Sequence, residues 1–294
     1  IQKNRQRSTI LIALFVGILA AVGYIYGQFT HTGYAGLGFA LVVSLGMTFV
    51  SWFFGDKIVL ATSGAQELTS REQSPYIWNL VENLAITAGL PRPRIYIIQD
   101  EAMNAFATGR DPQHASVALT TGIIQGLENE ELEGVLAHEL SHIKNEDIKV
   151  MMLAAVLVGA ITLLGDSFLR GLFFSRGGDR EENSGSRNGL FLILGIAFLV
   201  LSPLIGQLIQ LAISRRREYL ADASGALLTR YPEGLAKALE KIATQHAPVA
   251  RASTATAHLW ISNPFGEKRG FLQKLQHLFS THPPIDDRIQ KLRG

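Results

Sequence analysis

The feature that most limits the fold of this chain is a long uncharged stretch near its N-terminus. No Asp, Glu, Lys or Arg occurs between Ser8 and Gly55. Two apolar runs, at about 9–26 and 35–55, lie within this stretch. Each run is long enough to cross a bilayer as a helix. Because the second run follows the first after a short polar link, the pattern predicts a transmembrane hairpin (residues 1–55) rather than a cleaved signal peptide.

The whole chain is also more apolar than an ordinary soluble domain. Of its 294 residues, 47% are hydrophobic and 18% are charged, whereas soluble proteins carry roughly 25% charged residues. Two further apolar runs, at about 148–169 and 190–213, predict a second transmembrane pair (148–213) joined by a flexible Gly/Ser-rich loop at 170–189. The formal net charge of +2 gives no indication of a nucleic-acid partner.

Basic residues beside the apolar runs predict the orientation in the membrane. The basic segment Lys3–Arg7 precedes the first run, and the triplet Arg215–Arg217 follows the fourth. The positive-inside rule places both on the cytoplasmic side, although the arginines of the 170–189 loop do not follow it. The segments 56–147 and 214–294 then lie on the same side, and we expect them to form one cytoplasmic catalytic domain.

The first soluble segment shows a helix followed by short strands. Ser74 can cap the helix, Pro75 suits its first turn, and Gly89 ends it. The three predicted strands are Arg94–Gln99, Asn104–Thr108 and Ser116–Thr120. They predict a small antiparallel sheet. Its exposed edge could bind an extended peptide through backbone hydrogen bonds, and the alternative is a purely structural hairpin.

A metal-binding pattern stands just before the third apolar run. Residues His138-Glu139-Leu140-Ser141-His142 form an HExxH motif. Two imidazoles four residues apart share one helix face and can bind one Zn²⁺, and Glu139 beside them can take a proton from the attacking water. Asn129 is the predicted N-cap of this helix. Since no Pro or Gly occurs from Val135 to Leu157, we expect a nearly continuous helix that reaches the membrane.

The sequence also offers a third metal ligand. The chain has no cysteine, so the ligand must be His, Asp or Glu. Glu218 directly follows the fourth apolar run, just as the motif precedes the third. If these runs pack as antiparallel helices, Glu218 meets His138 and His142, and one Zn²⁺ per chain is bound. Asp222 lies one turn after Glu218 on the same face, where it can hydrogen-bond a ligand imidazole.

Taken together, these residues resemble the HtpX-type membrane metalloproteases, bacterial relatives of the type 1 CAAX prenyl protease. The resemblance covers nearly the whole chain and rests on the HExxH motif, Glu218 with Asp222, Asn104–Gly109, Ala257–Phe265, and Thr281–Pro284 with Arg288. It implies that Asn104, Ala105 and Phe106 lie on a substrate-binding edge strand. It also implies that His282 contacts the substrate or the oxyanion and that Arg288 supports the glutamate ligand.

The predicted fold is a mainly α membrane protein. It combines a four-helix transmembrane bundle with a cytoplasmic α+β zincin-like metalloprotease domain that carries the small antiparallel sheet. The resemblance implies a zinc endopeptidase of the bacterial cytoplasmic membrane that faces the cytoplasm. Such enzymes cleave misfolded or damaged membrane proteins in quality control and stress response, alongside possible protease or chaperone partners. The alternatives are a noncatalytic membrane chaperone or scaffold and a CAAX-type prenyl-protein protease, for which family analogy implies seven spans.

Overall fold

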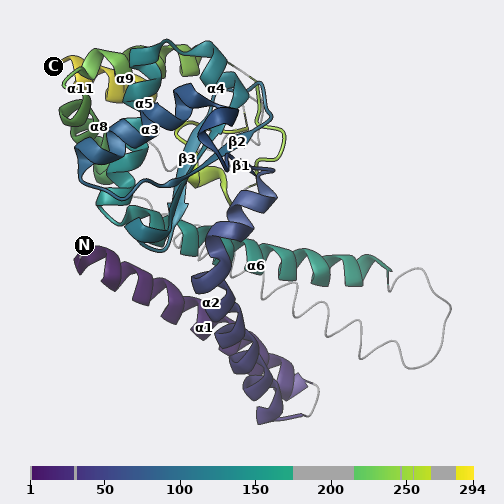
Figure 1. Ribbon diagram of the computed structural model, residues 1–294. Coiled ribbons are helices and arrows are strands. Elements are labelled where there is room, and N and C mark those ends of the chain that lie inside the picture. The colour runs from purple at the N-terminus through teal and green to yellow at the C-terminus, as the bar shows by residue number, and fades with distance from the viewer. Residues whose placement is uncertain (1, 30–31, 175–214, 246, 254, 266–282) are drawn as a thin grey trace.

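The protein consists of an N-terminal helical hairpin and a domain of helices around a small sheet (Figure 1). The computed structural model describes residues 2–29, 32–174, 215–245, 247–253, 255–265 and 283–294. The predicted fourth apolar run, at 190–213, and residues 175–189 of the predicted loop lie outside the described residues.

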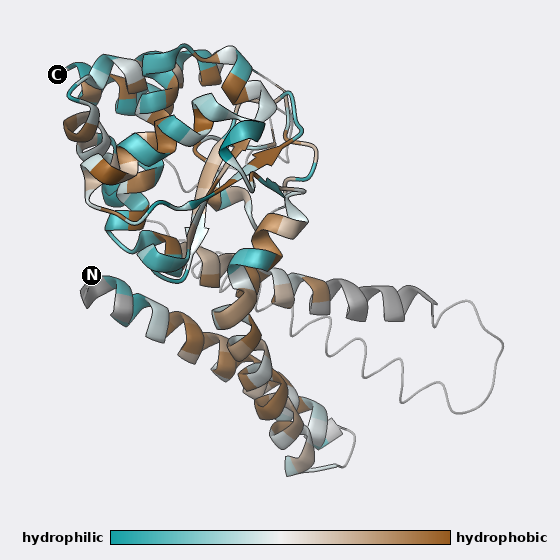
Figure 2. Ribbon diagram, in the orientation of Figure 1, coloured by the Kyte–Doolittle hydropathy of each residue, from teal (hydrophilic) through white to brown (hydrophobic). Residues whose placement is uncertain are grey.

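The N-terminal hairpin has the length and composition predicted for two membrane spans. It is formed by α1 (Gln2–Phe29) and α2 (Tyr34–Thr62). Within the described part of the chain, these two helices are the ones apolar and long enough to cross a membrane. Large side chains of α2 point away from the protein, and Phe39 is 73% exposed. Figure 2 shows this apolar hairpin beside a domain of mixed polarity, as expected if lipid covers the hairpin.

The helix that carries the HExxH motif ends before the third apolar run, so the nearly continuous helix that was predicted is broken at Asn145 and Glu146. Helix α5 (Asn129–Lys144) ends at its C-cap Asn145, and Glu146 adopts a left-handed backbone with φ of 54°. Helix α6 (Asp147–Phe174) begins directly after this residue. The break has a consequence for the site, because it places Asp147 in the first turn of α6, beside the end of α5.

Helix α6 joins the hairpin to the rest of the protein. Its first turns pack on α1 through a buried apolar cluster that includes Phe15, Leu157 and Val158. Beyond this contact α6 runs away from the hairpin (Figure 1). The four-helix bundle stays a prediction, because its fourth segment, at 190–213, lies outside the described residues.

The sheet is mixed rather than antiparallel. Its strand order is β1-β2-β4-β3, with β1 at Gln66–Glu67, β2 at Arg94–Ile98, β3 at Ala105–Gly109 and β4 at Ala115–Thr120. Strands β3 and β4 are antiparallel as predicted, but β2 and β4 run parallel. All six residues of β4 are buried. A strand buried on both faces belongs in the centre of a sheet, so β4 lies between β2 and β3.

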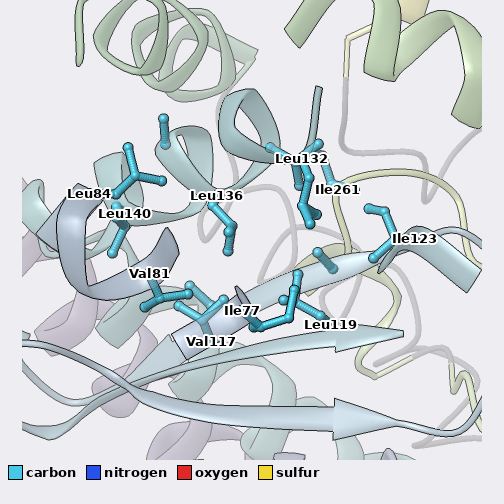
Figure 3. Packing of buried hydrophobic residues seen from close by; sticks show 14 of the residues in the cluster. Ile77, Val81, Leu84, Val117, Leu119, Ile123, Leu132, Leu136, Leu140 and Ile261 are labelled. Carbon is cyan, nitrogen blue, oxygen red and sulfur yellow. The ribbon is translucent and has the colours of Figure 1, made fainter. Parts of the chain in front are cut away.

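Side chains that alternate along the strands build two cores. On one face, Val117 and Leu119 pack under α3 (Pro75–Ala88) and α5, together with Val81, Leu136 and Leu140 (Figure 3). On the other face, Phe106, Tyr96 and Ala118 pack against the adjoining parts of α2 and α6 and against Trp260. The sheet is thus fixed between the motif helix and the end of the hairpin. Helix α3 begins at Pro75 and ends at Gly89 as predicted; Ser74 holds the N-cap position, but its side chain makes no cap hydrogen bond.

The remaining described elements complete the domain. They are η1 (Arg71–Gln73), η2 (Pro112–His114), α4 (Thr121–Gly126), α8 (Arg215–Thr229), α9 (Pro232–Thr244), η3 (Ala257–Leu259) and α11 (Ile285–Arg293). Helices α8 and α9 lie beside α5, and α11 lies against α9 (Figure 1).

Candidate metal centre

The motif helix is buried along most of its length. Its N-cap is Glu128 rather than the predicted Asn129, because Glu128 and Glu131 form a capping box. His138, Glu139 and His142 are at most 3% exposed. Burying three polar side chains is unfavourable unless each has a partner. The contacts of these residues therefore define the site.

Helix α8 brings Glu218 to the motif helix. Glu218 is 1% exposed, and it shares one face of α8 with Asp222 and Gly225. A Cβ atom at Gly225 would lie 3.0 Å from the backbone nitrogen of His138. The missing side chain thus lets α8 approach α5 closely enough for the predicted third ligand to reach the two histidines.

The donor atoms of these three residues meet at one point. His138 Nε2 lies 3.2 Å from His142 Nε2 and 3.8 Å from Glu218 Oε2. His142 Nε2 lies 3.5 Å from Glu218 Oε1. The two imidazole rings are nearly perpendicular, with an interplanar angle of 89°. Among the described residues, this trio forms the cluster able to hold a metal ion.

The protonation of the trio fits a bound cation. Each histidine presents its Nδ1 atom to a carboxylate, so the proton sits on Nδ1 and the lone pair of Nε2 faces the other ligands. Two such lone pairs and a carboxylate, all buried together, repel one another unless a metal ion or a proton on His142 lies between them. Two histidines and one glutamate are a ligand set of catalytic zinc, which leaves a fourth position for water or substrate.

Asp222 and Arg288 hold the first histidine. Asp222 Oδ1 lies 2.9 Å from His138 Nδ1. Arg288 is fully buried and donates to both oxygens of Asp222, at 2.9 and 2.7 Å. Burial opposes ionisation of Asp222, but the hydrogen bonds from His138 and Arg288 outweigh it and hold the pKa of this carboxyl at about 2. Arg288, predicted to support the glutamate ligand, thus acts on His138 through Asp222.

Asp147 holds the second histidine, and sequence reasoning did not find it. Its Oδ2 atom lies 3.2 Å from His142 Nδ1, and the residue is 2% exposed. A carboxylate five residues after a ligand could have drawn attention to it. On the continuous helix that was predicted, however, Asp147 would not point back at His142. Only the chain break at Glu146 makes this contact possible.

Glu139 lies between the ligands and the sheet. Its carboxylate accepts a hydrogen bond from the backbone N–H of Ala107 on β3. Burial raises the pKa of Glu139 to about 7, and the nearby Glu218 adds to the rise. A cation held by the trio would favour the ionised form again. Without a metal ion, Glu139 therefore gains and loses its proton near neutral pH, and with one it would be the carboxylate that can accept a proton.

Of the predicted substrate-binding residues, Ala105 and Phe106 begin the edge strand β3 and Asn104 directly precedes it. The amide of Asn104 exchanges hydrogen bonds with the backbone of Ser262, and the carbonyl of Ala105 accepts from the N–H of Ile261. Phe106 is buried against Trp260. The segment around Ile261 therefore already pairs with the first part of the β3 edge, while Ala107 faces the motif helix. His282 lies outside the described residues.

Comparison with known proteins agrees with this geometry. Residues 71–294 match Peptidase family M48. The chain is 46% identical over 291 residues to the "Protease HtpX homolog" of Tropheryma whipplei (strain Twist), covering 98% of this chain and 96% of that protein. It is 42% identical over 293 residues to the protein of the same name from Caldanaerobacter subterraneus subsp. tengcongensis, covering 99% and 95%.

The fold itself is similar to a known structure. The crystal structure of S. mikatae Ste24p matches with a TM-score of 0.52 and 19% sequence identity. The match covers 100% of this chain and 67% of that chain. At this level of identity the likeness concerns the arrangement of the chain alone.

Proposed function

The chain belongs to Peptidase family M48 and is a zinc metallopeptidase, and from this we propose that it cleaves membrane proteins within their cytoplasmic segments. The substrates we propose are misfolded or damaged membrane proteins, and the process is quality control under stress. The observation that carries the proposal is the buried His138, His142 and Glu218 cluster beside the base Glu139, in a domain attached to two candidate membrane helices.

The ligands and their partners suit peptide hydrolysis. His138, His142 and Glu218 would hold Zn²⁺, which supplies Lewis acidity and lowers the pKa of water to about 7. Glu139 would take a proton from the attacking water and later pass it to the leaving amine. Asp222 and Asp147 keep the proton of each imidazole on Nδ1, so that both Nε2 atoms remain ligands.

The edge of β3 suits an extended polypeptide. In the pairing of β3 with β4, Ala105 and Ala107 turn their backbone groups away from β4, toward the motif helix and Ile261. A substrate strand would add to this edge by backbone hydrogen bonds, and at Asn104 and Ala105 it would take the place of Ser262 and Ile261, which bond there in the structure. We propose Asn104, Ala105 and Phe106 as the segment that forms the substrate-binding edge. We also propose His282 as the residue that stabilises the oxyanion.

The proposed setting is the bacterial cytoplasmic membrane, with the site facing the cytoplasm. The two candidate spans support membrane attachment, and basic residues at their cytoplasmic ends support the orientation. Membership of a zinc peptidase family argues against the noncatalytic scaffold. Other membrane proteases or chaperones that handle the same substrates remain the proposed partners.

The test is proteolysis by the purified full chain in detergent with Zn²⁺. Glu139→Gln keeps the side-chain shape and removes the base, so we expect cleavage of an unfolded membrane protein to fall by about 10²–10⁴-fold with zinc still bound. Glu130→Gln makes the same change at an exposed position of the same helix and is the control. Equal rates for Glu139→Gln and the parent protein would refute the assigned base.

A CAAX-type prenyl-protein protease, the alternative that the shared sequence motifs leave open, is the second candidate. The two functions differ in the substrate rather than in the chemistry. Cleavage of a prenylated C-terminal peptide faster than of an unfolded membrane protein, at equal enzyme concentration, would favour the second candidate. The matched control is the same peptide without its prenyl group.

A further inference from the structure

A polar residue of the first membrane helix reaches the metal centre. Asn4, in the first turn of α1, is 7% exposed. Its Nδ2 atom donates to the carbonyl of Asn145 at 2.8 Å and to Oδ1 of Asp147 at 2.9 Å. Both acceptors belong to the chain break that separates α5 from α6. A residue more than 130 positions earlier in the sequence therefore contacts the carboxylate that holds His142.

Arg217 completes a closed network around this carboxylate. Its Nη2 atom donates to Oδ1 of Asn4 at 2.5 Å, and its Nη1 atom lies 3.1 Å from Oδ1 of Asp147. Asp147 therefore has one oxygen fixed by Asn4 and Arg217 and the other directed at His142. Arg217 also precedes the ligand Glu218 in α8. Three separate helices are thus joined at one buried carboxylate.

From these contacts we infer that Asn4 is a positioning residue of the metal centre, through which the first membrane helix orients His142. The inference rests on the proposed zinc site. Asn4 does not touch the ligands and acts through Asp147. A carboxylate held from one side only could turn toward Arg217 and release His142. The amide of Asn4 blocks this rotation because it binds the same oxygen and the neighbouring carbonyl of Asn145.

The chemistry of an asparagine suits this position. The side chain donates to Asp147 and accepts from Arg217, so it satisfies groups of opposite charge. An aspartate would place a second carboxylate against Asp147. The place of Asn4 is set in turn by the packing of α1 on α6, where Leu11 and Phe15 meet Val158. Correct seating of the hairpin therefore becomes a condition for a well-formed metal site.

The test is the zinc dissociation constant of the full chain in detergent, measured by competition with a chelator. We expect Asn4→Ala to weaken zinc binding about tenfold, within the range known for outer hydrogen-bond partners of metal ligands. Asp147→Ala should weaken it about 10–100-fold, and the double variant should bind no more weakly than Asp147→Ala. Asn4→Asp has the same shape but no amide donor, so it should also weaken zinc binding. It serves as the second variant in case Asn4→Ala does not fold.

Two variants of α1 separate positioning from simple packing. Leu11→Ala loosens the packing of α1 on α6 that places Asn4, so it should lower the melting temperature and weaken zinc binding by less than Asn4→Ala does. Ser8→Ala alters a buried polar residue one turn from Asn4 and should change neither property. The inference is overturned if Asn4→Ala and Asn4→Asp bind zinc like the parent, or if the effects of Asn4→Ala and Asp147→Ala add. Failure of the parent protein to bind zinc would instead overturn the proposed function.

Discussion

His142 is held in a different electrostatic setting from its neighbour His138. Burial lowers the pKa of His138, which keeps this imidazole neutral and ready to bind metal. For His142, burial acts in the same direction, but the hydrogen bond to Asp147 and the charge of Glu218 outweigh it and raise the pKa to about 9. In the metal-free protein, a proton on His142 therefore competes with zinc up to about that pH.

This competition predicts a pH dependence of zinc binding. Below the pKa of His142 each zinc ion must displace one proton, so the dissociation constant should fall about tenfold per pH unit from pH 7 to about 9 and then level off. Asp147→Asn should lower the pKa of His142, so the zinc dissociation constant of this variant should level off at a lower pH than that of the parent. The measurement is chelator competition at each pH, corrected for protonation of the chelator.

A second histidine and aspartate pair provides the control for this experiment. Asp111 Oδ1 lies 2.7 Å from His114 Nδ1 on the protein surface. Asp111→Asn removes a comparable contact that is remote from the ligands, so the pH dependence of zinc binding should be that of the parent. A dissociation constant that stays constant between pH 7 and 9 would contradict the assigned protonation of His142.

Arg288 is the most deeply buried charge of the site, and its removal should be costly. Arg288→Met keeps most of the side-chain volume but leaves the Asp222 carboxylate without its bidentate partner. Breaking a buried ion pair from one side costs about 3–5 kcal/mol of unfolding free energy. Chemical denaturation of the detergent-solubilised protein measures the loss.

The same helix offers a matched control. Arg293, at the end of α11, pairs with Glu233 and Glu240, but its side chain is 40% exposed. Surface ion pairs contribute about 0–1 kcal/mol, so Arg293→Met should hardly change stability. Equal losses for the two arginine variants would mean that the buried pair of Arg288 and Asp222 contributes no more than a surface contact.

At the scale of elements, the approach of α8 to α5 decides whether three ligands meet. Gly225→Ala would introduce a Cβ atom 3.0 Å from the backbone of His138, which cannot move aside like a flexible side chain. Although alanine favours helix by about 1 kcal/mol, overpacking of this kind costs about 1–3 kcal/mol. We expect α8 to shift and zinc binding to weaken several-fold.

The exposed face of the same helix provides the comparison for Gly225. Ala223 is exposed, so Ala223→Val adds bulk to α8 without touching α5. Zinc affinity and melting temperature should remain those of the parent within a few tenths of a kcal/mol. If Gly225→Ala also binds zinc normally, the close contact of the two helices is not what positions Glu218.

Local signals in the sequence predicted some elements well and others poorly. The Pro75 start and the Gly89 end of α3 were predictable because both residues act through the conformation of their own backbone. Glu218 could be placed near the HExxH motif because the motif lies just before the third apolar run and Glu218 lies just after the fourth. The turn at Glu146 has no Pro or Gly to signal it, and the contact of Asn145 with Asn4 that secures it is long-range. Asp147 was missed for this reason.

The parallel pairing of β2 and β4 was missed for a related reason. Three short apolar strands in succession are compatible with a simple meander, which is the commoner arrangement. What decides the order is burial of β4 on both faces, by α3 and α5 on one side and by the Phe106 and Trp260 cluster on the other. These partners lie far apart in the sequence, so no local pattern indicates them.

At the scale of the whole molecule, the hairpin, α6 and the metal domain form one connected unit. Helix α1 packs on α6 through apolar contacts and touches the site through Asn4. The exposed apolar side chains of α2 remain for lipid. Since the charged ends of the hairpin and the metal domain lie at the same end of α1 and α2, a membrane that accommodates the hairpin leaves the domain on one side of the bilayer (Figure 2).

This arrangement predicts which positions are accessible from each side of the membrane. The chain contains no cysteine, so a single introduced cysteine can be labelled specifically. Thr32 precedes α2 in the link between the two candidate spans, and Glu130 lies exposed on the domain. In intact bacterial cells with a permeabilised outer layer, a membrane-impermeant maleimide should label Thr32→Cys. It should label Glu130→Cys only after the cytoplasmic membrane is opened.

The expected asymmetry follows from the cost of moving charge across lipid. Translocating the domain side would carry the Arg215–Arg217 triplet and the basic start of α1 across the membrane, against the positive-inside rule. Labelling in the reverse order would place the metal centre outside the cytoplasm and exclude cytoplasmic substrates. Equal labelling of Thr32→Cys and Glu130→Cys in intact cells would show that the hairpin lies on the membrane rather than across it.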